Sequence, residues 1–255
     1  MTLFLSSIFE WLRLRDNQLA VAIEKCAVLH LGVTNPKREY EIGGSIIPQV
    51  ESIRDIGIEV DQTMKFSTHC KTIAQRANRL SNLFFLTFRC RDKEFMLNFY
   101  ATYIRPLLET ATTVWNPYLM KDINVLEGVQ RKFTKRVPGM FERSYEQRRA
   151  ALGLKTLEHR RLCNDLTMCF RALNGFIDLD FHEFFELNRG RHLRGHCQKL
   201  VVPKFRKNCR KYDFACRTVN AWNALPEELF ATSTLFSFKR KLNALDLSHF
   251  LNYRE

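Results

Sequence analysis

Apolar residues between Asp92 and Val137 recur at a helical period, and this regularity constrains the fold more than any other part of the sequence. The pattern predicts one helix from Asp92 to about Thr110 and a second from Asp122 to Val137, joined by a Trp-Asn-Pro connection. Each helix has an apolar face that must pack against other parts of the chain. The faces consist of Phe95, Met96, Phe99, Tyr100, Tyr103, Ile104, Leu107 and Leu108 in the first helix, and of Ile123, Leu126, Val129, Phe133 and Val137 in the second.

Four basic residues lie opposite the apolar face of the second helix: Arg131, Lys132, Lys135 and Arg136. No acidic residue stands among them, which is typical of a helix face presented to an anionic partner. The whole chain is also basic, with 40 Lys and Arg against 27 Asp and Glu, a formal charge of +13. Surplus charge that serves only solubility is the alternative interpretation.

Shorter elements surround these two helices. An amphipathic helix over Met1 to Ala22, a strand over 26–31, a hairpin turning at Gly43 and Gly44, and a strand alternating Ile56, Ile58 and Val60 predict a small antiparallel sheet near the N-terminus. Further helices are expected after the caps Ser67, Asp92, Ser144, Thr156 and Thr234. The expected fold is therefore α+β and mainly α, with regions 1–65, 66–176 and 177–255.

A second basic stretch runs from Arg189 to Arg217, with Asp213 as its single acid and with Phe205, Tyr212 and Phe214 interleaved. Cations along a backbone with aromatic rings available for stacking are typical of nucleic-acid binding. The candidate contacts in this partly irregular region are Arg194, Lys199, Lys204, Arg206, Lys207, Arg210, Lys211 and Arg217.

Zinc is the alternative for the same stretch, because it contains His192, His196, Cys197, Cys209 and Cys216. No two cysteines have the short spacing with which one turn presents two thiolates, so the sequence favours no metal site. All 8 Cys are scattered singly and are interpreted as reduced thiols. With no signal peptide and no apolar run near the ~18 residues of a membrane span, we expect an intracellular protein of the nucleus or cytoplasm that is neither secreted nor membrane-bound.

Several strings carry a resemblance to a known family. They are Glu-Lys-Cys-Ala-Val-Leu-His-Leu-Gly at 24–32, Ile-Arg-Asp-Ile-Gly-Ile at 53–58, Tyr-Ile-Arg-Pro-Leu-Leu-Glu at 103–109, Val-Trp-Asn-Pro at 114–117, Leu-Glu-Gly-Val-Gln-Arg-Lys at 126–132, Leu-Arg-Gly-His at 193–196, Cys-Arg-Thr at 216–218 and Ala-Trp-Asn-Ala-Leu-Pro at 221–226. In this order and spacing they resemble the C-terminal part of non-LTR (LINE-type) retrotransposon reverse transcriptases. The resemblance implies the last palm strands, a helical thumb and a basic tail, which would bind RNA, DNA or an RNA–DNA hybrid.

The resemblance also implies a role for the hairpin at Gly43 and Gly44, which would correspond to the primer grip; an ordinary hairpin that finishes a sheet is equally compatible with the sequence. The complete family enzyme uses Mg²⁺ held by adjacent aspartates. This chain has no adjacent Asp-Asp pair. We therefore expect no catalytic residue, no cofactor and no polymerisation by this chain alone, with the N-terminal polymerase part missing. A host-retained nucleic-acid adaptor and a gene-model fragment that does not fold are the alternatives.

Overall fold

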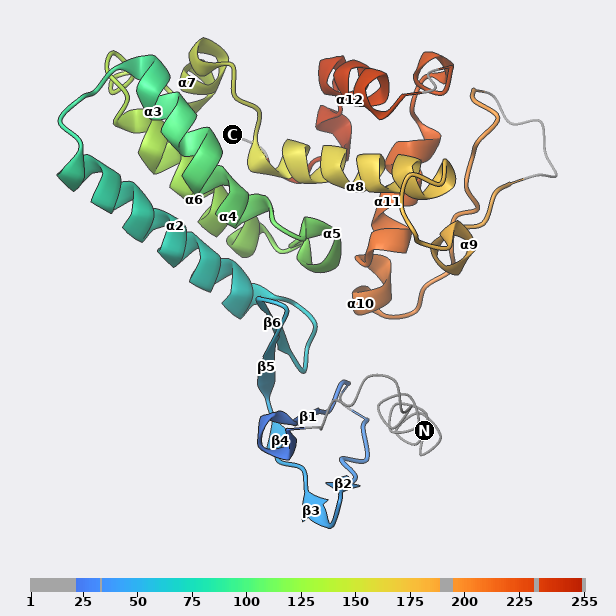
Figure 1. Ribbon diagram of the computed structural model, residues 1–255. Helices are drawn as coiled ribbons and strands as arrows, with labels where there is room; N and C mark the ends of the chain where they lie inside the picture. Colours follow the sequence, from blue (N-terminus) through green and yellow to red (C-terminus); the bar gives the residue numbers. More distant parts are fainter. Residues whose placement is uncertain (1–21, 33, 189–194, 232–233, 254–255) are drawn as a thin grey trace. The chain divides into compact units, whose positions relative to one another are not determined.

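The computed structural model describes residues 22–32, 34–188, 195–231 and 234–253, which belong to two compact units, 1–64 and 65–255. Most of the described secondary structure is helical, and the strands are short and lie near the N-terminus (Figure 1). The expected α+β, mainly α class is confirmed. The helix predicted over Met1 to Ala22 lies, except for Ala22, outside the described residues.

The first unit contains three two-stranded pairs. β1 (Val28–Leu29) pairs in parallel with β4 (Gln49–Val50). The pairs of β2 (Glu41–Ile42) with β3 (Ser45–Ile46) and of β5 (Ser52–Asp55) with β6 (Ile58–Asp61) are antiparallel. The expectation of one small antiparallel sheet is therefore corrected to three separate pairs, one of them parallel. A short 3-10 turn, Ile23–Lys25, precedes them. Gly43 and Gly44 join β2 to β3 with φ of 58° and 82°. The predicted hairpin is therefore confirmed, because its turn needs positive φ at both central positions.

The strand predicted from alternating isoleucines is wrong at its first residue. Ile56 lies in the turn between β5 and β6 with a φ of 44°, and its side chain is 95% exposed. Ile58 and Val60 lie in β6 as expected. The alternation continued by one residue into the Ile56-Gly57 turn, so the pattern alone placed the strand too early.

The second unit is built of helices. Its first half contains α2 (Ser67–Thr87), α3 (Lys93–Phe99), a π-helical segment (Tyr100–Ile104), α4 (Arg105–Glu109), α5 (Thr112–Trp115), α6 (Met120–Lys135), α7 (Tyr145–Leu152) and α8 (Leu157–Leu173). Then follow α9 (Phe181–Phe184), α10 (Asn208–Lys211), α11 (Phe214–Asn223) and α12 (Leu235–Ala244), with 3-10 turns at Glu227–Leu229 and Ser248–Phe250.

The helix predicted from Asp92 to Thr110 is continuous but not uniformly α. The π-helical segment Tyr100–Ile104 leads into α4, where Pro106 stands in the first turn. Proline has no backbone N–H to donate to the preceding turn. The wider π-helical turn before Pro106 accommodates this missing hydrogen bond. The predicted apolar face is also narrower than expected. Its residues Met96, Tyr100, Ile104 and Leu108 are fully buried, while Phe95 and Tyr103 are exposed.

Most predicted helix caps are confirmed. Asp92 accepts a hydrogen bond from Phe95 N, Ser144 and Gln147 form a capping box, and Thr156 and Thr234 cap α8 and α12. The predicted Ser67 cap is wrong. Phe66 holds the cap position with a φ of 59°, and Ser67 Oγ donates instead to Asp122 Oδ2 at 2.6 Å. The serine at the start of α2 thus donates its hydrogen bond to the buried Asp122 of α6 and does not cap its own helix.

A single core joins α8 to the C-terminal helices. Phe170 of α8 stacks on Phe238 of α12 with ring centroids 4.0 Å apart, and Trp222 of α11 is fully buried beside them. The regions expected as 66–176 and 177–255 both lie within the second unit, and this core contains residues of both. Residues 163–172 therefore depend on residues 200–247 for their burial.

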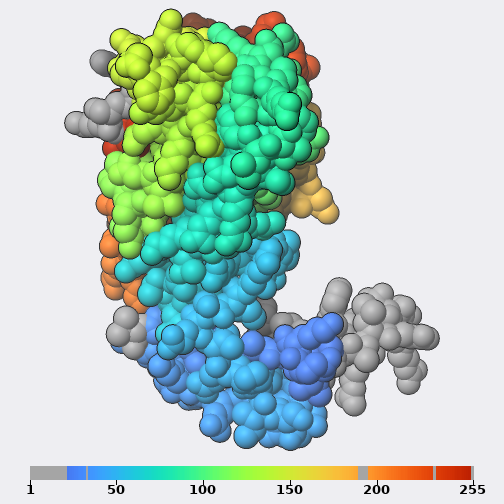
Figure 2. Space-filling view, turned by 90° about the vertical axis from the view of Figure 1, so that its left-hand side faces the viewer, coloured from blue at the N-terminus to red at the C-terminus, as the bar shows by residue number. Residues whose placement is uncertain are grey.

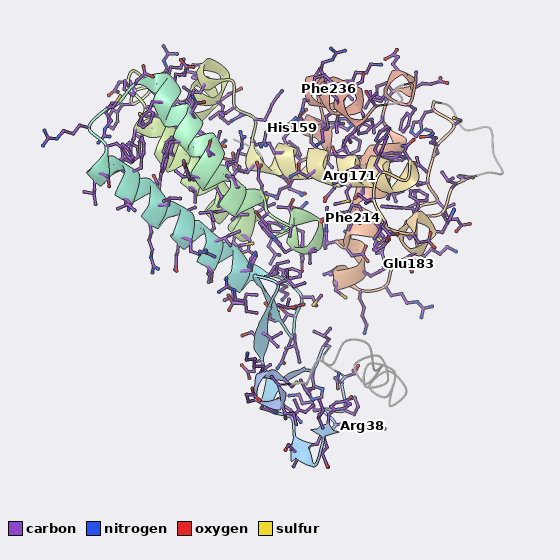
Figure 3. The ribbon with its side chains drawn as sticks, viewed as in Figure 1. Arg38, His159, Arg171, Glu183, Phe214 and Phe236 are labelled. Atoms are coloured by element: carbon purple, nitrogen blue, oxygen red, sulfur yellow. The ribbon has the colours of Figure 1, made fainter. Side chains whose placement is uncertain are left out.

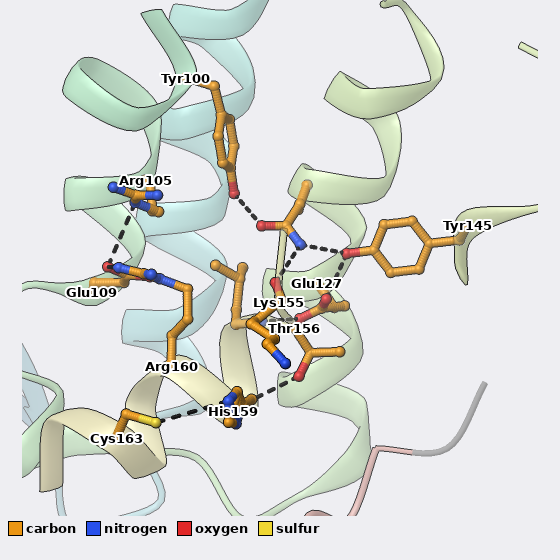
Figure 4. Close-up of polar contacts among 12 residues, drawn as sticks. Tyr100, Arg105, Glu109, Glu127, Tyr145, Lys155, Thr156, His159, Arg160 and Cys163 are labelled. Atoms are coloured by element: carbon orange, nitrogen blue, oxygen red, sulfur yellow. Dashed lines mark hydrogen bonds and ion pairs between the residues drawn. The ribbon is translucent and has the colours of Figure 1, made fainter. Parts of the chain in front are cut away.

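A buried polar network ties the helices of the first half together (Figure 4). Gln130 of α6 accepts from Tyr100 Oη at 2.7 Å and donates to Tyr145 Oη at 2.8 Å. Tyr145 Oη donates to Glu127 Oε1 at 2.5 Å, and Glu127 Oε2 accepts from Leu157 N at 2.9 Å. Burial raises the pKa of the Glu127 carboxyl. These bonds fix α6, α7 and the start of α8 against one another, because an unpaired polar group at these positions costs ~1–3 kcal/mol.

The pH dependence of stability should reflect His159 of α8, which is labelled in Figure 3. Burial, and then the neighbouring Lys155 and Arg160, lower its pKa from 6.5 to about 4. A base with a lowered folded-state pKa favours unfolding in acid, so stability should fall as the pH drops from about 6.5 toward 4. Urea unfolding at pH 7 and pH 5 measures the loss.

His159→Gln should make that loss smaller. Part of it should remain, because burial also lowers the pKa of His196. An equal loss between pH 7 and pH 5 in the variant and in the natural chain would contradict the assignment to His159.

Candidate nucleic-acid interface

The basic face predicted for α6 is exposed. The side chains of Arg131, Lys132, Lys135 and Arg136 all reach solvent, and none forms a salt bridge with a described carboxylate. The opposite face of the helix is buried through Ile123, Leu126, Val129 and Phe133, and Val137, two residues after the end of α6, is buried as well. Packing on one side therefore holds the cations outward on the other, as the periodicity predicted.

Three of these cations line a surface hollow between α6 and α2. Lys132, Lys135 and Arg136 form one wall, and Asn78, Ser81 and Asn82 of α2 form the other. The hollow has a volume of about 540 Å³ and is open to solvent. In Figure 2 the teal surface of α2 adjoins the yellow-green surface around the end of α6. The site combines ammonium and guanidinium charges with amide and hydroxyl groups that can donate hydrogen bonds.

Aromatic rings hold two of the cations in place. The Arg136 guanidinium lies 4.2 Å from the Phe85 ring centroid, and its Nη1 donates to Asn82 Oδ1 at 3.0 Å. Lys135 Nζ lies 4.5 Å from the ring centroid of Phe141, which is 64% exposed. Cation–π contacts of this kind are worth ~0.5–1 kcal/mol at exposed sites. They orient the charges without neutralising them.

Arg131 has a different environment from its three neighbours. Its guanidinium donates to Tyr253 Oη and lies 5.2 Å from the Tyr145 ring centroid. The end of the described chain is held at this place by Glu158, whose carboxylate accepts from Asn252 N at 2.9 Å and from Tyr253 N at 2.7 Å. Arg131 therefore contacts the protein, although part of it stays exposed.

Arg217, predicted as a nucleic-acid contact, is instead a structural residue. Its Nε and Nη2 donate to the two carboxylate oxygens of Asp165 at 2.8 and 3.0 Å, and Nη2 also donates to the Thr113 carbonyl at 2.7 Å. Its side chain is only 14% exposed and that of Asp165 only 1%. Because a buried carboxylate needs a paired charge, this arginine is not available to a ligand, and the prediction is corrected.

Lys199 is also engaged within the protein. Its Nζ donates to the Asn223 carbonyl at 3.0 Å, at the C-terminal end of α11. In the same place Trp222 Nε1 donates to Gln198 O at 2.8 Å, and the Asn223 amide bonds to both N and O of Leu200 at 2.8 and 2.9 Å. These bonds fasten residues 198–200 to α11. Lys199 thus satisfies a helix-end carbonyl, which weakens its candidacy as a nucleic-acid contact.

The other predicted cations of the C-terminal stretch are exposed: Lys204, Arg206, Lys207, Arg210 and Lys211. Arg210 Nη1 is paired with Asp213 Oδ2 at 2.6 Å, and Lys211 Nζ lies 5.1 Å from the Tyr212 ring centroid. The predicted contact Arg194 lies outside the described residues, as do Arg189, Arg191 and His192. Four exposed cations of this stretch therefore have no described carboxylate partner.

Two of the groups weighed as zinc ligands are buried within the protein, whereas Cys197 and Cys209 are exposed free thiols. His196 is buried with Nε2 3.0 Å from Trp222 O, and Cys216 is buried in α11. Among the described residues no three His, Cys, Asp or Glu side chains gather as metal ligands would. Nor does any described helix have the length and apolar character to cross a membrane.

The α2 wall of the hollow was not predicted from the sequence. Asn78, Ser81 and Asn82 are spaced as i, i+3 and i+4, so they share one helix face. These three polar residues on one face of α2 are the feature of the sequence from which the wall could have been predicted. Its meaning depends on α6 lying beside it, which no local pattern of α2 reveals.

Comparisons with known proteins add little to this geometry. No protein-family model matches the chain, and no solved structure matches it. An uncharacterized protein of Caenorhabditis elegans is 25% identical over 126 residues, which are 48% of this chain and 64% of that protein. The match thus spans less than two thirds of the relative, and it carries no activity to this chain.

Proposed function

We propose that this protein binds the phosphate backbone of a nucleic acid in the hollow between α2 and α6. The observation that carries the proposal is a wall of three exposed cations, Lys132, Lys135 and Arg136, without a described carboxylate partner. Three positive charges this close repel one another, and an anionic ligand relieves the repulsion. Phosphate groups that follow one another along a strand match a row of cations along a helix.

The polar wall of α2 adds hydrogen-bonding groups that suit a phosphate ligand. Asn78 and Asn82 offer neutral hydrogen-bond donors across the hollow from the cations, while Ser81, which also lines it, is buried. Phosphate and sugar oxygens accept such bonds from Asn and Ser side chains in nucleic-acid complexes. The contacts would fix the backbone in place without reading its sequence.

The resemblance to non-LTR reverse transcriptases gives the proposal a wider frame. In that frame the chain is a C-terminal fragment of such an element, with the helices of residues 66–176 as its thumb, residues 177–255 as its basic C-terminal region and the Gly43-Gly44 hairpin as its primer grip. It would bind RNA, DNA or template–primer inside the cell, in the nucleus or cytoplasm, and would not polymerise by itself. A host protein that has kept this fragment as a nucleic-acid adaptor would use the same surface.

The salt dependence of binding to a short RNA–DNA hybrid tests the proposal, with fluorescence anisotropy of the labelled hybrid as the measurement. The variant Lys132→Ala/Arg136→Ala removes two cations of the hollow. Each phosphate contact contributes about 0.7–0.9 to the slope of log affinity against log salt. We therefore expect the slope of the variant to be shallower by about 1.5, and its affinity at low salt to fall at least tenfold.

The matched control is Lys239→Ala/Arg240→Ala on α12, which also removes one exposed lysine and one exposed arginine. It should leave the slope unchanged, because its charges lie outside the hollow. If the slope fell by the same amount in the control as in Lys132→Ala/Arg136→Ala, the net charge of the protein alone would attract the hybrid. The hollow would then not be a binding site.

A further inference from the structure

A second pocket of the second unit lies between the connection after α5 and the helices α10 and α11. It is lined by Asn116, Tyr118, Phe205, Lys211, Tyr212 and Asn220, among other residues, and has a volume of about 230 Å³. Pockets for drug-sized ligands usually measure ~300–1,000 Å³. This one suits a single planar ring system.

Aromatic rings form much of the pocket. Tyr118 and Tyr212 are stacked with their centroids 3.9 Å apart and an interplanar angle of 3°. Phe205 lines the same pocket with 45% of its side chain exposed. An exposed phenylalanine beside a stacked tyrosine pair gives a flat ligand apolar surface to lie against.

The two carboxylates at the pocket are already satisfied. Asp165 accepts two bonds from Arg217 and one from Asn116 Nδ2 at 3.2 Å. Glu158 accepts from Asn252 and Tyr253. A cationic ligand would therefore find no carboxylate lacking a partner, and the pocket favours a neutral or anionic ligand.

Two lining groups remain available to a ligand. The Asn220 side chain is exposed on α11, where its amide can donate one hydrogen bond and accept another. The Lys211 ammonium is exposed and has no described carboxylate partner. Lys204, Arg206 and Lys207 are exposed in the same stretch. A flat ring with a hydrogen-bonding edge, attached to a phosphate, matches this combination.

We propose that this pocket binds one unpaired nucleobase of a single-stranded nucleic acid, with its phosphate near Lys211. The inference rests on the proposed function only in that both sites would serve one nucleic-acid ligand. The hollow of α2 and α6 holds phosphates, whereas this pocket holds a base. Base–aromatic contacts tolerate any sequence because every base has a flat face.

The test compares two single-stranded octamers of equal charge, one of thymidine and one abasic, by anisotropy with the full chain. The natural chain should bind the thymidine octamer roughly tenfold more tightly. Phe205→Ala and Asn220→Ala should each bring this ratio toward one, because each removes a base contact. Val202→Ala, an exposed apolar residue of the same stretch, should leave the ratio unchanged.

The two proposals fail in different ways. A ratio near one in the natural chain, or a ratio that Phe205→Ala and Asn220→Ala both leave unchanged, would overturn the base pocket. Lys132→Ala/Arg136→Ala should weaken both octamers by the same factor and keep the ratio. A variant of the hollow without effect, together with an intact ratio, would overturn the hollow and support the pocket. Absence of binding to either octamer would overturn the base pocket, whereas the salt slope for the RNA–DNA hybrid decides the hollow separately.

Discussion

Replacing Arg217 with methionine is expected to lower the free energy of unfolding by about 3–5 kcal/mol, because it leaves Asp165 buried without its paired charge. Arg217 donates to both oxygens of that carboxylate and to backbone carbonyls near α5, so one guanidinium joins α5, α8 and α11. Urea unfolding of the natural chain and of Arg217→Met at pH 7 measures the difference.

The stability lost in Arg217→Met should be smaller in acid. Burial raises the pKa of the Asp165 carboxyl, and Arg217 opposes that rise. Without the arginine the pKa rises further, so the folded variant takes up a proton more readily than the unfolded chain. Stability conferred by a raised carboxyl pKa is present at low pH and is lost as the pH rises through the folded-state pKa. The difference between the two proteins should therefore be smaller at pH 5 than at pH 7.

Asp165→Asn in the same background provides the control. It removes the unpaired charge and should restore part of the lost stability at pH 7. Binding gives a separate check, since Arg217→Met should leave the salt slope for the RNA–DNA hybrid unchanged. If Arg217→Met were as stable as the natural chain and its salt slope for the hybrid fell by about one, Arg217 would be a nucleic-acid contact and the structural assignment would be wrong.

Trp222→Ala should destabilise the protein by a similar amount, about 3–5 kcal/mol, because it removes a large side chain from a packed core. The indole is fully buried, with Phe230 and Phe238 among its neighbours at centroid distances of 5.1 and 6.3 Å. Its Nε1 also donates to Gln198 O. Thermal and urea unfolding of the variant measure the loss.

Two further substitutions separate packing from hydrogen bonding. Trp222→Phe keeps most of the apolar volume but leaves the Gln198 carbonyl without its donor, which should cost about 1–3 kcal/mol. Phe236→Ala on α12 removes an aromatic side chain that is 76% exposed (Figure 3), and a change within about 0.5 kcal/mol is expected. If Trp222→Ala were as mild as Phe236→Ala, the core around α11 would not be the packed unit described.

Local chemistry in the sequence was sufficient to predict much of the fold. The capping box at Ser144 and the hairpin at Gly43 and Gly44 each depend on a few neighbouring residues, and both were predicted correctly. Ser67 failed because its hydroxyl donates to Asp122, 55 positions later. A cap is a local preference, and a distant acceptor on another helix outweighed it.

The same distinction explains the candidate sites. The cations of α6 were predictable because the apolar face of the helix fixes where the other face points. Arg217 was not, since its basic surroundings in the sequence say nothing of Asp165, which lies 52 residues earlier. Likewise, Tyr118 and Tyr212 stack although they are 94 positions apart in the sequence. Contacts between distant segments decide which basic and aromatic residues remain free for a ligand.

The hydrogen bonds that Glu158 accepts from Asn252 and Tyr253 have a consequence for the order in which the second unit forms during synthesis. The carboxylate on α8 is made about 94 residues before the two amides that satisfy it. Until then it must remain hydrated, and the nearby end of α8 must stay partly open to water. Domains generally fold as units during synthesis, and α2 to α7 belong to the same unit as α8 although they are made first. Closure around α8 then waits for the last residues that the structure describes.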